Sequence, residues 1–418
     1  MAPMNALIKT LTTLALLLLP LQTFATASSF KPGRGLSMDL WTTWPDESAW
    51  GDAGVILPFP EWRRFLDAGD LKALARDGFT MVRLPVDPAV FLSSQTGSLR
   101  GRLMASVRDT VAMIVGAGLD VIVDLHAIPG GENRSIGTND LMTDEAAFDR
   151  YVGLVRDMAA LVADTDPARV ALELMNEPTA DCSGRQAETW SDRLQRLVAT
   201  ARAAAPRTTL VVSGACWGGA DGLVALDPSR FPDDNLVWSF HSYAPFILTH
   251  QGAGWTGDIS PYATGLPYPP YGANARETAA ALKAIRARVR AEAPWLRRAG
   301  IISFVEEELA KIDSPEDLKV VIGTPFDQVA DWADRHGIAR ENILLGEFGM
   351  IRQEYDHEFR TAPAWRAAYY GDMIRLAEDH GFGWSLWGFG GAFGVIEAFE
   401  GRPSEPDVLD VIRGLPSR

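Results

Sequence analysis

Eight apolar segments, each short enough to be one strand, recur along the chain and alternate with longer amphipathic segments. They are rich in Val, Ile and Leu and cover residues 35–41, 81–86, 120–126, 170–178, 209–215, 236–243, 343–349 and 383–390. Parallel strands covered on both faces have this nearly continuous apolar character. Eight such strands with helices between them predict a (β/α)8 (TIM) barrel of the α/β class. An open doubly wound sheet is the alternative, but no glycine-rich phosphate loop follows the first apolar segment.

The segments between the strands carry helix signals. Apolar side chains recur at intervals of three and four residues in segments 102–117, 144–163 and 187–205. We expect Thr143 to cap the second of these helices, Ser314 and Pro315 to begin another, and Gly381 to end one before the last strand. After the sixth strand, residues 250–272 are rich in Gly, Pro and Tyr. They predict an extended loop at the barrel rim that forms one wall of a cleft.

The first residues are typical of a secretory signal peptide. Lys9 precedes an apolar stretch over residues 10–21, and Ala25-Thr26-Ala27 matches the small-residue cleavage pattern. We therefore predict a signal peptide over residues 1–27, cleavage after Ala27, and a secreted or periplasmic protein. A membrane anchor is the alternative, but the apolar stretch is short for a span. Without linkers or repeats, residues 28–418 are expected to form one domain that does not contact a membrane.

The charge of the chain limits its partners. The formal net charge is −15, and removing residues 1–27, which hold one lysine and no acid, makes it −16. Nucleic-acid binding depends on clustered Lys and Arg, so this charge argues against it. It suits a monomer that acts on a neutral polysaccharide or oligosaccharide. A strongly anionic substrate would require a local basic patch.

Two cysteines, Cys182 and Cys216, each follow a predicted strand on the same rim. An oxidising compartment allows them to form a disulfide. Two unpaired buried thiols are the alternative.

Two glutamates stand where predicted strands end. Glu177 lies in Leu-Met-Asn-Glu-Pro at the end of the fourth strand, and Glu347 in Leu-Gly-Glu-Phe-Gly at the end of the seventh. In a barrel, the carboxyl ends of the strands carry the chemistry. Two carboxyl groups about 5–5.5 Å apart, one protonated and one ionised, can break a glycosidic bond with retention. We predict that Glu177 is the acid/base, its pKa raised by its anionic neighbour, and that Glu347 is the nucleophile.

With these glutamates, the chain resembles glycoside hydrolase family 5, which contains cellulase-like retaining β-glycanases. The resemblance spreads over nearly all of the mature chain. Members share eight active-site residues, and the matches here are Arg83, His126, Asn176, Glu177, His241, Tyr243, Glu347 and Trp387. The resemblance implies hydrolysis by double displacement without a cofactor.

Each supporting residue has a physical role in such a site. Arg83 would keep Glu347 ionised and oriented, and Tyr243 would donate a hydrogen bond to it. Asn176 can bind the sugar 2-hydroxyl. The histidines at 126 and 241 can bind other hydroxyls, and Trp387 would form a floor under the sugar ring. No His-Glu-x-x-His motif or Cys/His cluster is present, so no catalytic metal is predicted.

The substrate is predicted less directly. Aromatic residues follow several strands, and some of them are expected to line a cleft with several sugar subsites. The candidates are Trp41, Trp44, Trp50, Trp217, Trp255, Tyr268, Tyr271, Phe389 and Phe393. Packing within loops is the alternative. A β-1,4-glucan cleaved internally is the favoured substrate. A β-1,4-mannanase, an exo-acting β-1,3-glucanase, a glycosyl-transferring enzyme and a protein that processes a bacterial exopolysaccharide remain alternatives. An inactive carbohydrate-binding protein is the alternative from another class.

Overall fold

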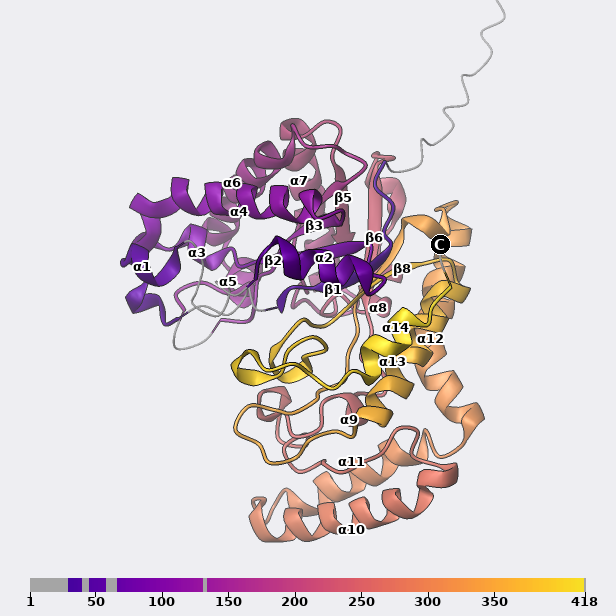
Figure 1. Cartoon of the computed structure of the whole chain (residues 1–418). Coiled ribbons are helices and arrows are strands. Elements are labelled where there is room, and N and C mark those ends of the chain that lie inside the picture. The colour runs from indigo at the N-terminus through magenta and orange to yellow at the C-terminus, as the bar shows by residue number, and fades with distance from the viewer. Residues whose placement is uncertain (1–28, 40–44, 58–65, 131–133, 417–418) are drawn as a thin grey trace, which may run out of the picture.

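The structure is a computed structural model that describes residues 29–39, 45–57, 66–130 and 134–416. The predicted signal peptide and Trp44 lie outside these residues. Eight parallel strands close into a barrel in sequence order, because the first strand pairs with both the second and the eighth (Figure 1). The strands are β1 (Arg34–Ser37), β2 (Met81–Val86), β3 (Asp120–Leu125), β4 (Val170–Glu173), β5 (Thr209–Ser213), β6 (Leu236–His241), β7 (Ile343–Glu347) and β8 (Gly383–Leu386). The (β/α)8 prediction is confirmed.

Helices follow the strands and surround the barrel (Figure 1). Before β3 they are α1 (Ala53–Ile56), α2 (Ala68–Arg76), α3 (Ala89–Leu92) and α4 (Arg100–Gly116). Between β3 and β6 they are α5 (Thr138–Thr143), α6 (Glu145–Val162), α7 (Arg185–Ala204) and α8 (Ala220–Val224). After β6 they are α9 (Phe246–Thr249), α10 (Ala275–Glu292), α11 (Arg298–Ala310), α12 (Pro315–Arg335), α13 (Pro363–Asp379) and α14 (Asp407–Arg413). None of the described helices combines the length and apolar character that a membrane span needs.

Two of the predicted helix boundaries agree with the structure and one does not. Ser314 caps α12 with Pro315 in its first turn, and Gly381 follows the end of α13 with a positive φ of 76°. Thr143 was expected to cap α6, but it ends α5 instead. Asp144 is the cap, because its carboxylate accepts hydrogen bonds from the backbone N–H groups of residues 146 and 147.

The inside of the barrel has an apolar floor with polar residues above it. Phe30, which precedes β1, and one residue from each of β2 to β7 form a separate buried cluster: Met81, Ile122, Ala171, Val211, Val237 and Leu344. Side chains two positions apart on a strand point to the same face. The next inward residues are therefore Arg83, Asp124, Glu173, Ser213, Ser239 and Gly346. The charged residues of this set lie directly below the rim.

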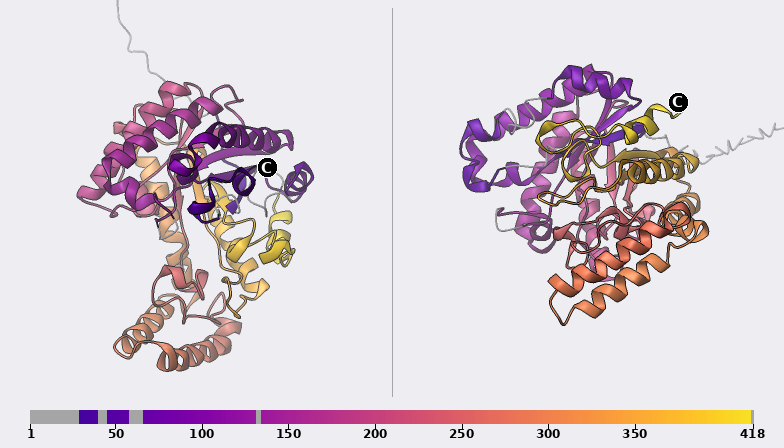
Figure 2. Two further views of the ribbon diagram at one scale, coloured as in Figure 1. Left: turned by 90° about the vertical axis from the view of Figure 1, so that its left-hand side faces the viewer. Right: turned by 60° about the horizontal axis from the view of Figure 1, so that its bottom comes forward.

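A helical hairpin is added to the barrel between β6 and β7. Helices α10 and α11 lie side by side outside the ring of barrel helices (Figures 1 and 2). The sequence predicted an extended loop here, and residues 250–272 do form irregular structure before α10. A groove of about 970 Å³ separates α10 from the loop that follows β7. None of the eight residues that match the family lines this groove.

Candidate active site

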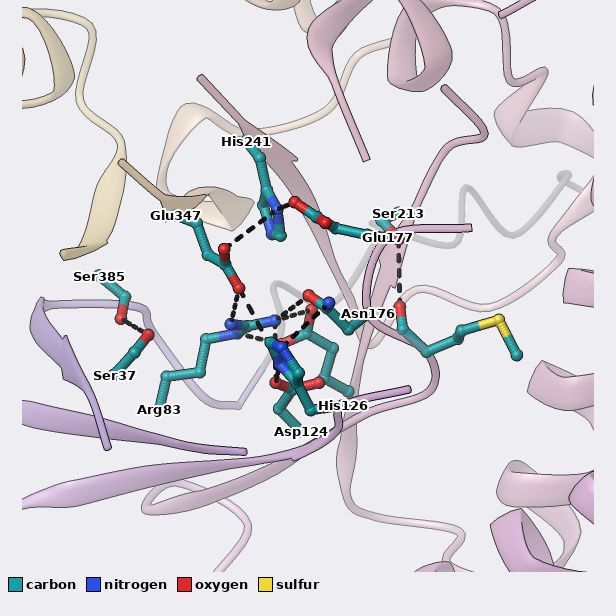
Figure 3. A network of polar contacts seen from close by, with 12 residues as sticks. Ser37, Arg83, Asp124, His126, Asn176, Glu177, Ser213, His241, Glu347 and Ser385 are labelled. Carbon is teal, nitrogen blue, oxygen red and sulfur yellow. Dashed lines mark hydrogen bonds and ion pairs between the residues drawn. The ribbon is translucent and has the colours of Figure 1, made fainter. Parts of the chain in front are cut away.

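The eight predicted site residues come together at the carboxyl end of the barrel. They are supplied by strands β2, β6 and β7 and by the residues that follow β3, β4, β6 and β8. Figure 3 labels six of them, with Glu347, His126 and Asn176 near the guanidinium of Arg83 and with Glu177 beside His241. Six of the eight predicted strands extend two to five residues past the observed ones at this end, whereas the second and third agree to within one residue.

Glu347, the last residue of β7, is held at both carboxylate oxygens. Arg83 Nη1 donates to Oε1 at 2.5 Å, and the hydroxyl of Tyr243 donates to Oε2 at 2.9 Å. The Glu347 side chain is only 5% exposed. An ionised carboxylate with a cation on one oxygen and a hydroxyl on the other is fixed in one orientation. This environment suits an attacking carboxylate.

Gly346 allows the approach of a neighbouring strand to Glu347. A Cβ atom at this position would lie 2.4 Å from Ser239 Oγ and 2.9 Å from His241 Nε2. Both contacts are shorter than van der Waals packing allows. A glycine before Glu347 therefore lets β6 place His241 against the site.

Glu177 has a different environment. It follows β4 with a φ of 38°, a conformation that is strained for a non-glycine residue. Its carboxylate Oε1 lies 2.9 Å from His241 Nδ1, and a quarter of its side chain is exposed. Burial raises the pKa of Glu177 to about 7, although His126 and Arg83 pull it down. Burial is thus the main cause of the raised pKa, whereas the sequence analysis suggested a neighbouring carboxylate. The carboxylate of Glu173 raises the pKa of Glu177 further.

The separation of the two carboxyl groups distinguishes two reaction geometries. One carboxylate oxygen of Glu177, one of Glu347 and a nitrogen of His241 all lie within 4.8 Å of one another. An inverting enzyme needs room for a water molecule and keeps its carboxyl groups about 6.5–9.5 Å apart. The observed spacing instead suits direct attack by one carboxylate while the other supplies a proton.

His126, Asn176 and Trp387 form the remaining wall. The rings of His126 and Trp387 are stacked, with centroids 5.1 Å apart and planes 14° apart. Asn176 Oδ1 accepts a hydrogen bond from Arg83 Nη2 at 2.9 Å, and its Nδ2 lies 3.2 Å from His126 Nε2. Asn176 is 3% exposed. These contacts fix one amide orientation beside Glu177.

Two buried acids of the site were missed by the sequence analysis. Glu173 binds Arg83 through two hydrogen bonds of 2.7 and 3.0 Å, and Asp124 Oδ2 lies 3.0 Å from Arg83 Nη2. All three side chains are fully buried. An ionisable residue within an apolar strand must be paired when it is buried. By this rule, the position of each acid within an apolar segment could have indicated a buried, paired carboxylate.

The aromatic residues divide into exposed and buried groups. Trp217 is 50% exposed and Trp255 65% exposed, and the indole N–H of Trp255 donates to Glu354 at 2.8 Å. Trp50, Tyr268 and Phe389, expected as candidates for the cleft, are buried in the core, which makes that expectation wrong for them. Of the nine candidates, Trp217 and Trp255 are the exposed ones among the described residues. Phe393 is buried, Tyr271 is half-buried, and Trp41 lies outside the described residues, as Trp44 does.

A disulfide joins Cys182 to Cys216 and thereby links two rim loops. The first loop carries Glu177 and the second carries Trp217. Backbone N–H groups of Cys216 and Trp217 also donate to the carbonyl oxygens of residues 180 and 178, at 2.9 and 3.0 Å. Both of these donors have positive φ, at 62° and 55°. Strained backbone persists only where its surroundings hold it.

We expect loss of this disulfide to destabilise the protein. The bond closes a sequence separation of 34 residues. Replacing Cys182 and Cys216 together with alanine should lower the free energy of unfolding by about 2–4 kcal/mol, as measured by urea denaturation. A reducing agent should shift the transition of the native protein in the same direction and leave the double variant unchanged. Equal stability of the two proteins would contradict this expectation.

Glu177, His241 and Glu347 could also bind a divalent cation, since two carboxylates and an imidazole are suitable ligands. Their existing contacts with one another, Arg83 and Tyr243 account for their proximity without one. That the site needs no catalytic metal therefore stays a prediction. Dialysis against a chelator should leave the hydrolysis rate unchanged, and a loss restored by one metal would contradict it.

Comparison with known proteins gives a consistent family. Residues 61–392 match the cellulase family, glycosyl hydrolase family 5. Endoglucanase 3 of Fibrobacter succinogenes is 22% identical over 355 residues, which cover 79% of this chain and 47% of that protein. Endoglucanase C of Acetivibrio thermocellus is 27% identical over 206 residues, which cover 49% of this chain and 58% of that protein. The chain thus spans about half the length of these curated relatives.

Solved structures share the fold at low sequence identity. Cel5A of Thermotoga maritima in complex with cellobiose superposes with a TM-score of 0.64 at 20% identity, covering 91% of this chain and 97% of that one. The cellulose synthase subunit Z of Clostridioides difficile gives a TM-score of 0.63 at 19% identity, covering 91% and 99%. At this identity, the similarity shows the barrel fold alone.

Proposed function

The chain belongs to glycosyl hydrolase family 5, and on this premise we propose that it is a secreted, retaining endo-β-glucanase that cleaves β-1,4-glucosidic bonds. The observation that carries the proposal is that Glu177 and Glu347 have carboxylate oxygens within 4.8 Å of each other and lie in different environments. Glu347 is bound by Arg83 and Tyr243, whereas burial raises the pKa of Glu177 to about 7. One group is arranged as an anion and the other as an acid near neutral pH.

The proposed reaction has two displacements. A Glu347 oxygen attacks the anomeric carbon, the bond from that carbon to the leaving oxygen breaks, and the proton of Glu177 passes to the leaving oxygen. The resulting Glu177 carboxylate then takes a proton from water, whose oxygen attacks the same carbon. The bond to Glu347 breaks, and both glutamates return to their first states. Two inversions give net retention at the anomeric carbon.

The surrounding residues support this reaction. Arg83 and Tyr243 orient Glu347, and Asn176, which Arg83 holds and which precedes Glu177, would bind the 2-hydroxyl of the sugar being cleaved. The half-buried ring of Trp387, which stacks on His126, would contact the apolar face of that sugar. The names of the curated relatives support a glucan as substrate.

A panel of polysaccharides tests the proposal. The chain beginning at Ser28 would be incubated with carboxymethyl-cellulose, barley mixed-linkage glucan, laminarin, glucomannan and galactomannan. We expect a rapid fall in the viscosity of the first two and a β-anomeric product by NMR. Activity on galactomannan alone would move the substrate to mannan, and activity on laminarin from chain ends would favour an exo-acting β-1,3-glucanase. An α-anomeric product would refute the retaining mechanism.

Trp217 is expected to bind the sugar on the leaving-group side, because its loop is linked to the loop of Glu177. Replacing it with alanine should raise KM for cellotetraose about tenfold, the loss of one aromatic stacking contact of about 1.4 kcal/mol. Hydrolysis of an aryl β-cellobioside should change little, since its leaving group needs no subsite. Trp295, which is exposed in the turn between α10 and α11, provides a matched control for removing a surface indole. Equal effects of W217A and W295A would contradict the assignment.

A further inference from the structure

Asp124 lies beneath the site and contacts two of its members. It stands two residues before His126 and is fully buried, with both residues on the β3 side of the barrel (Figure 3). Its Oδ2 atom lies 2.6 Å from His126 Nδ1 and 3.0 Å from Arg83 Nη2. The set of eight family residues does not include it. One carboxylate oxygen of Asp124 thus contacts both an arginine and a histidine of the site.

This contact determines which nitrogen of His126 carries the proton. Burial lowers the pKa of His126 to about 4, so the ring is neutral and has one N–H group. The guanidinium of Arg83 forms an ion pair with Oδ2, and its positive charge favours the ionised carboxylate, which can only accept. His126 must then donate from Nδ1. Its Nε2 atom is left with a lone pair, 3.2 Å from Asn176 Nδ2.

The lone pair on His126 in turn fixes the amide of Asn176. Asn176 Nδ2 donates to Nε2, while its Oδ1 accepts from Arg83 Nη2 at 2.9 Å. The flipped amide would place its NH2 group against the guanidinium and its oxygen against the lone pair. Both contacts would be repulsive. Only one orientation is therefore allowed, and it keeps the second N–H of Nδ2 available beside Glu177.

We propose that Asp124 is a positioning residue that acts through His126 to orient Asn176 toward the 2-hydroxyl of the sugar being cleaved. The proposal rests on the proposed function, in which that hydroxyl contact strengthens in the transition state. Asp124 does not touch the substrate. It supplies the acceptor that selects the His126 tautomer, and the tautomer selects the amide orientation.

A substrate pair isolates this role. An aryl β-cellobioside and its analogue lacking the 2-hydroxyl on the ring beside the aryl group would be compared. Asp124→Leu, which removes the acceptor and keeps the number of side-chain heavy atoms, should lower kcat/KM about 10- to 100-fold on the first substrate. On the 2-deoxy analogue the change should stay within about threefold, because the contact that Asp124 supports is already missing.

Two isosteric variants separate the acceptor from the charge. Asp124→Asn keeps an oxygen for His126 and Arg83, and Glu173→Gln removes a charge from the same arginine without touching His126. Both should keep the native ratio of rates on the two substrates more closely than Asp124→Leu does. The proposal would be overturned if Asp124→Asn and Glu173→Gln lowered kcat/KM on the first substrate as selectively as Asp124→Leu does. It would also be overturned if Asp124→Leu lowered kcat/KM equally on both substrates.

An NMR measurement decides the tautomer independently of activity. The chain has six histidines, so the ring nitrogens of His126 can be assigned by comparison with a His126→Gln sample. Above pH 7, the native protein should show the proton on Nδ1. A proton on Nε2 would overturn the proposal even if Asp124→Leu failed to fold. If the native protein hydrolysed no aryl β-glycoside, the proposed function would be refuted, and the catalytic role of Asp124 with it. The assignment of the His126 tautomer would still be tested by the NMR measurement.

Discussion

Replacing Glu347 with glutamine is expected to lower the turnover of β-glucan by at least about 10⁴-fold. Glutamine has nearly the same shape and can keep the contacts of its oxygen with Arg83 or Tyr243. It cannot form the ester with the anomeric carbon on which the proposed reaction depends. The first displacement therefore has no nucleophile. Initial rates on mixed-linkage glucan would measure the loss.

Two controls distinguish a nucleophile from a structural carboxylate. Glu188→Gln changes an exposed glutamate on α7 and should leave the rate unchanged. Glu347→Ala opens space beside the anomeric carbon, and added azide should restore hydrolysis of an aryl β-cellobioside by attack from that side. The product should be the α-glycosyl azide, formed with one inversion. A β-glycosyl azide, or a glutamine variant that keeps a tenth of native activity, would show that Glu347 is not the nucleophile.

The barrel and the site residues could be predicted because both follow from local patterns. Strand periodicity places side chains two residues apart on one face, so Met81 on the barrel floor puts Arg83 above it. The strand ends then bring Asn176, Glu177 and Glu347 to one rim. The family resemblance supplied the remaining members of the site.

The carboxylate network could not be predicted, because it depends on how strands are staggered around the barrel. Asp124, Glu173 and Glu347 lie far apart in the sequence, yet all three pair with the guanidinium of Arg83. A sequence shows that a buried acid needs a partner, but not which one. The burial of several aromatic residues could not be predicted either. The sequence places Tyr268 in a loop, yet its hydroxyl donates to Asp372 and its ring lies in the core.

The pKa of Glu177 shows a related gap. Two nearby glutamates suggest that repulsion raises it, but the largest cause in the structure is burial of the carboxyl group itself. Burial depends on the loops that cover the site, including the loop held by Cys216. The sequence alone therefore identifies Glu177 as a candidate acid but does not show how deeply its carboxyl group is buried.

Glu177 should therefore control the alkaline limb of the pH profile. The first displacement needs Glu177 protonated, so kcat/KM on glucan should fall as pH rises through about 7, by tenfold per pH unit above it. Glu177→Gln should lose about 10²- to 10⁴-fold on glucan and much less on an aryl β-cellobioside with a good leaving group. On that aryl substrate, the variant should show no alkaline limb near pH 7.

The second buried acid with a similar pKa acts in the opposite direction. Burial raises the pKa of Asp124 to about 7 against the pull of Arg83. Its ionised form is the one that accepts from His126, so loss of its proton should favour activity rather than reduce it. Asp124→Asn should therefore retain the alkaline limb that Glu177→Gln removes. An alkaline limb that disappeared in Asp124→Asn and persisted in Glu177→Gln would show that Glu177 is not the general acid.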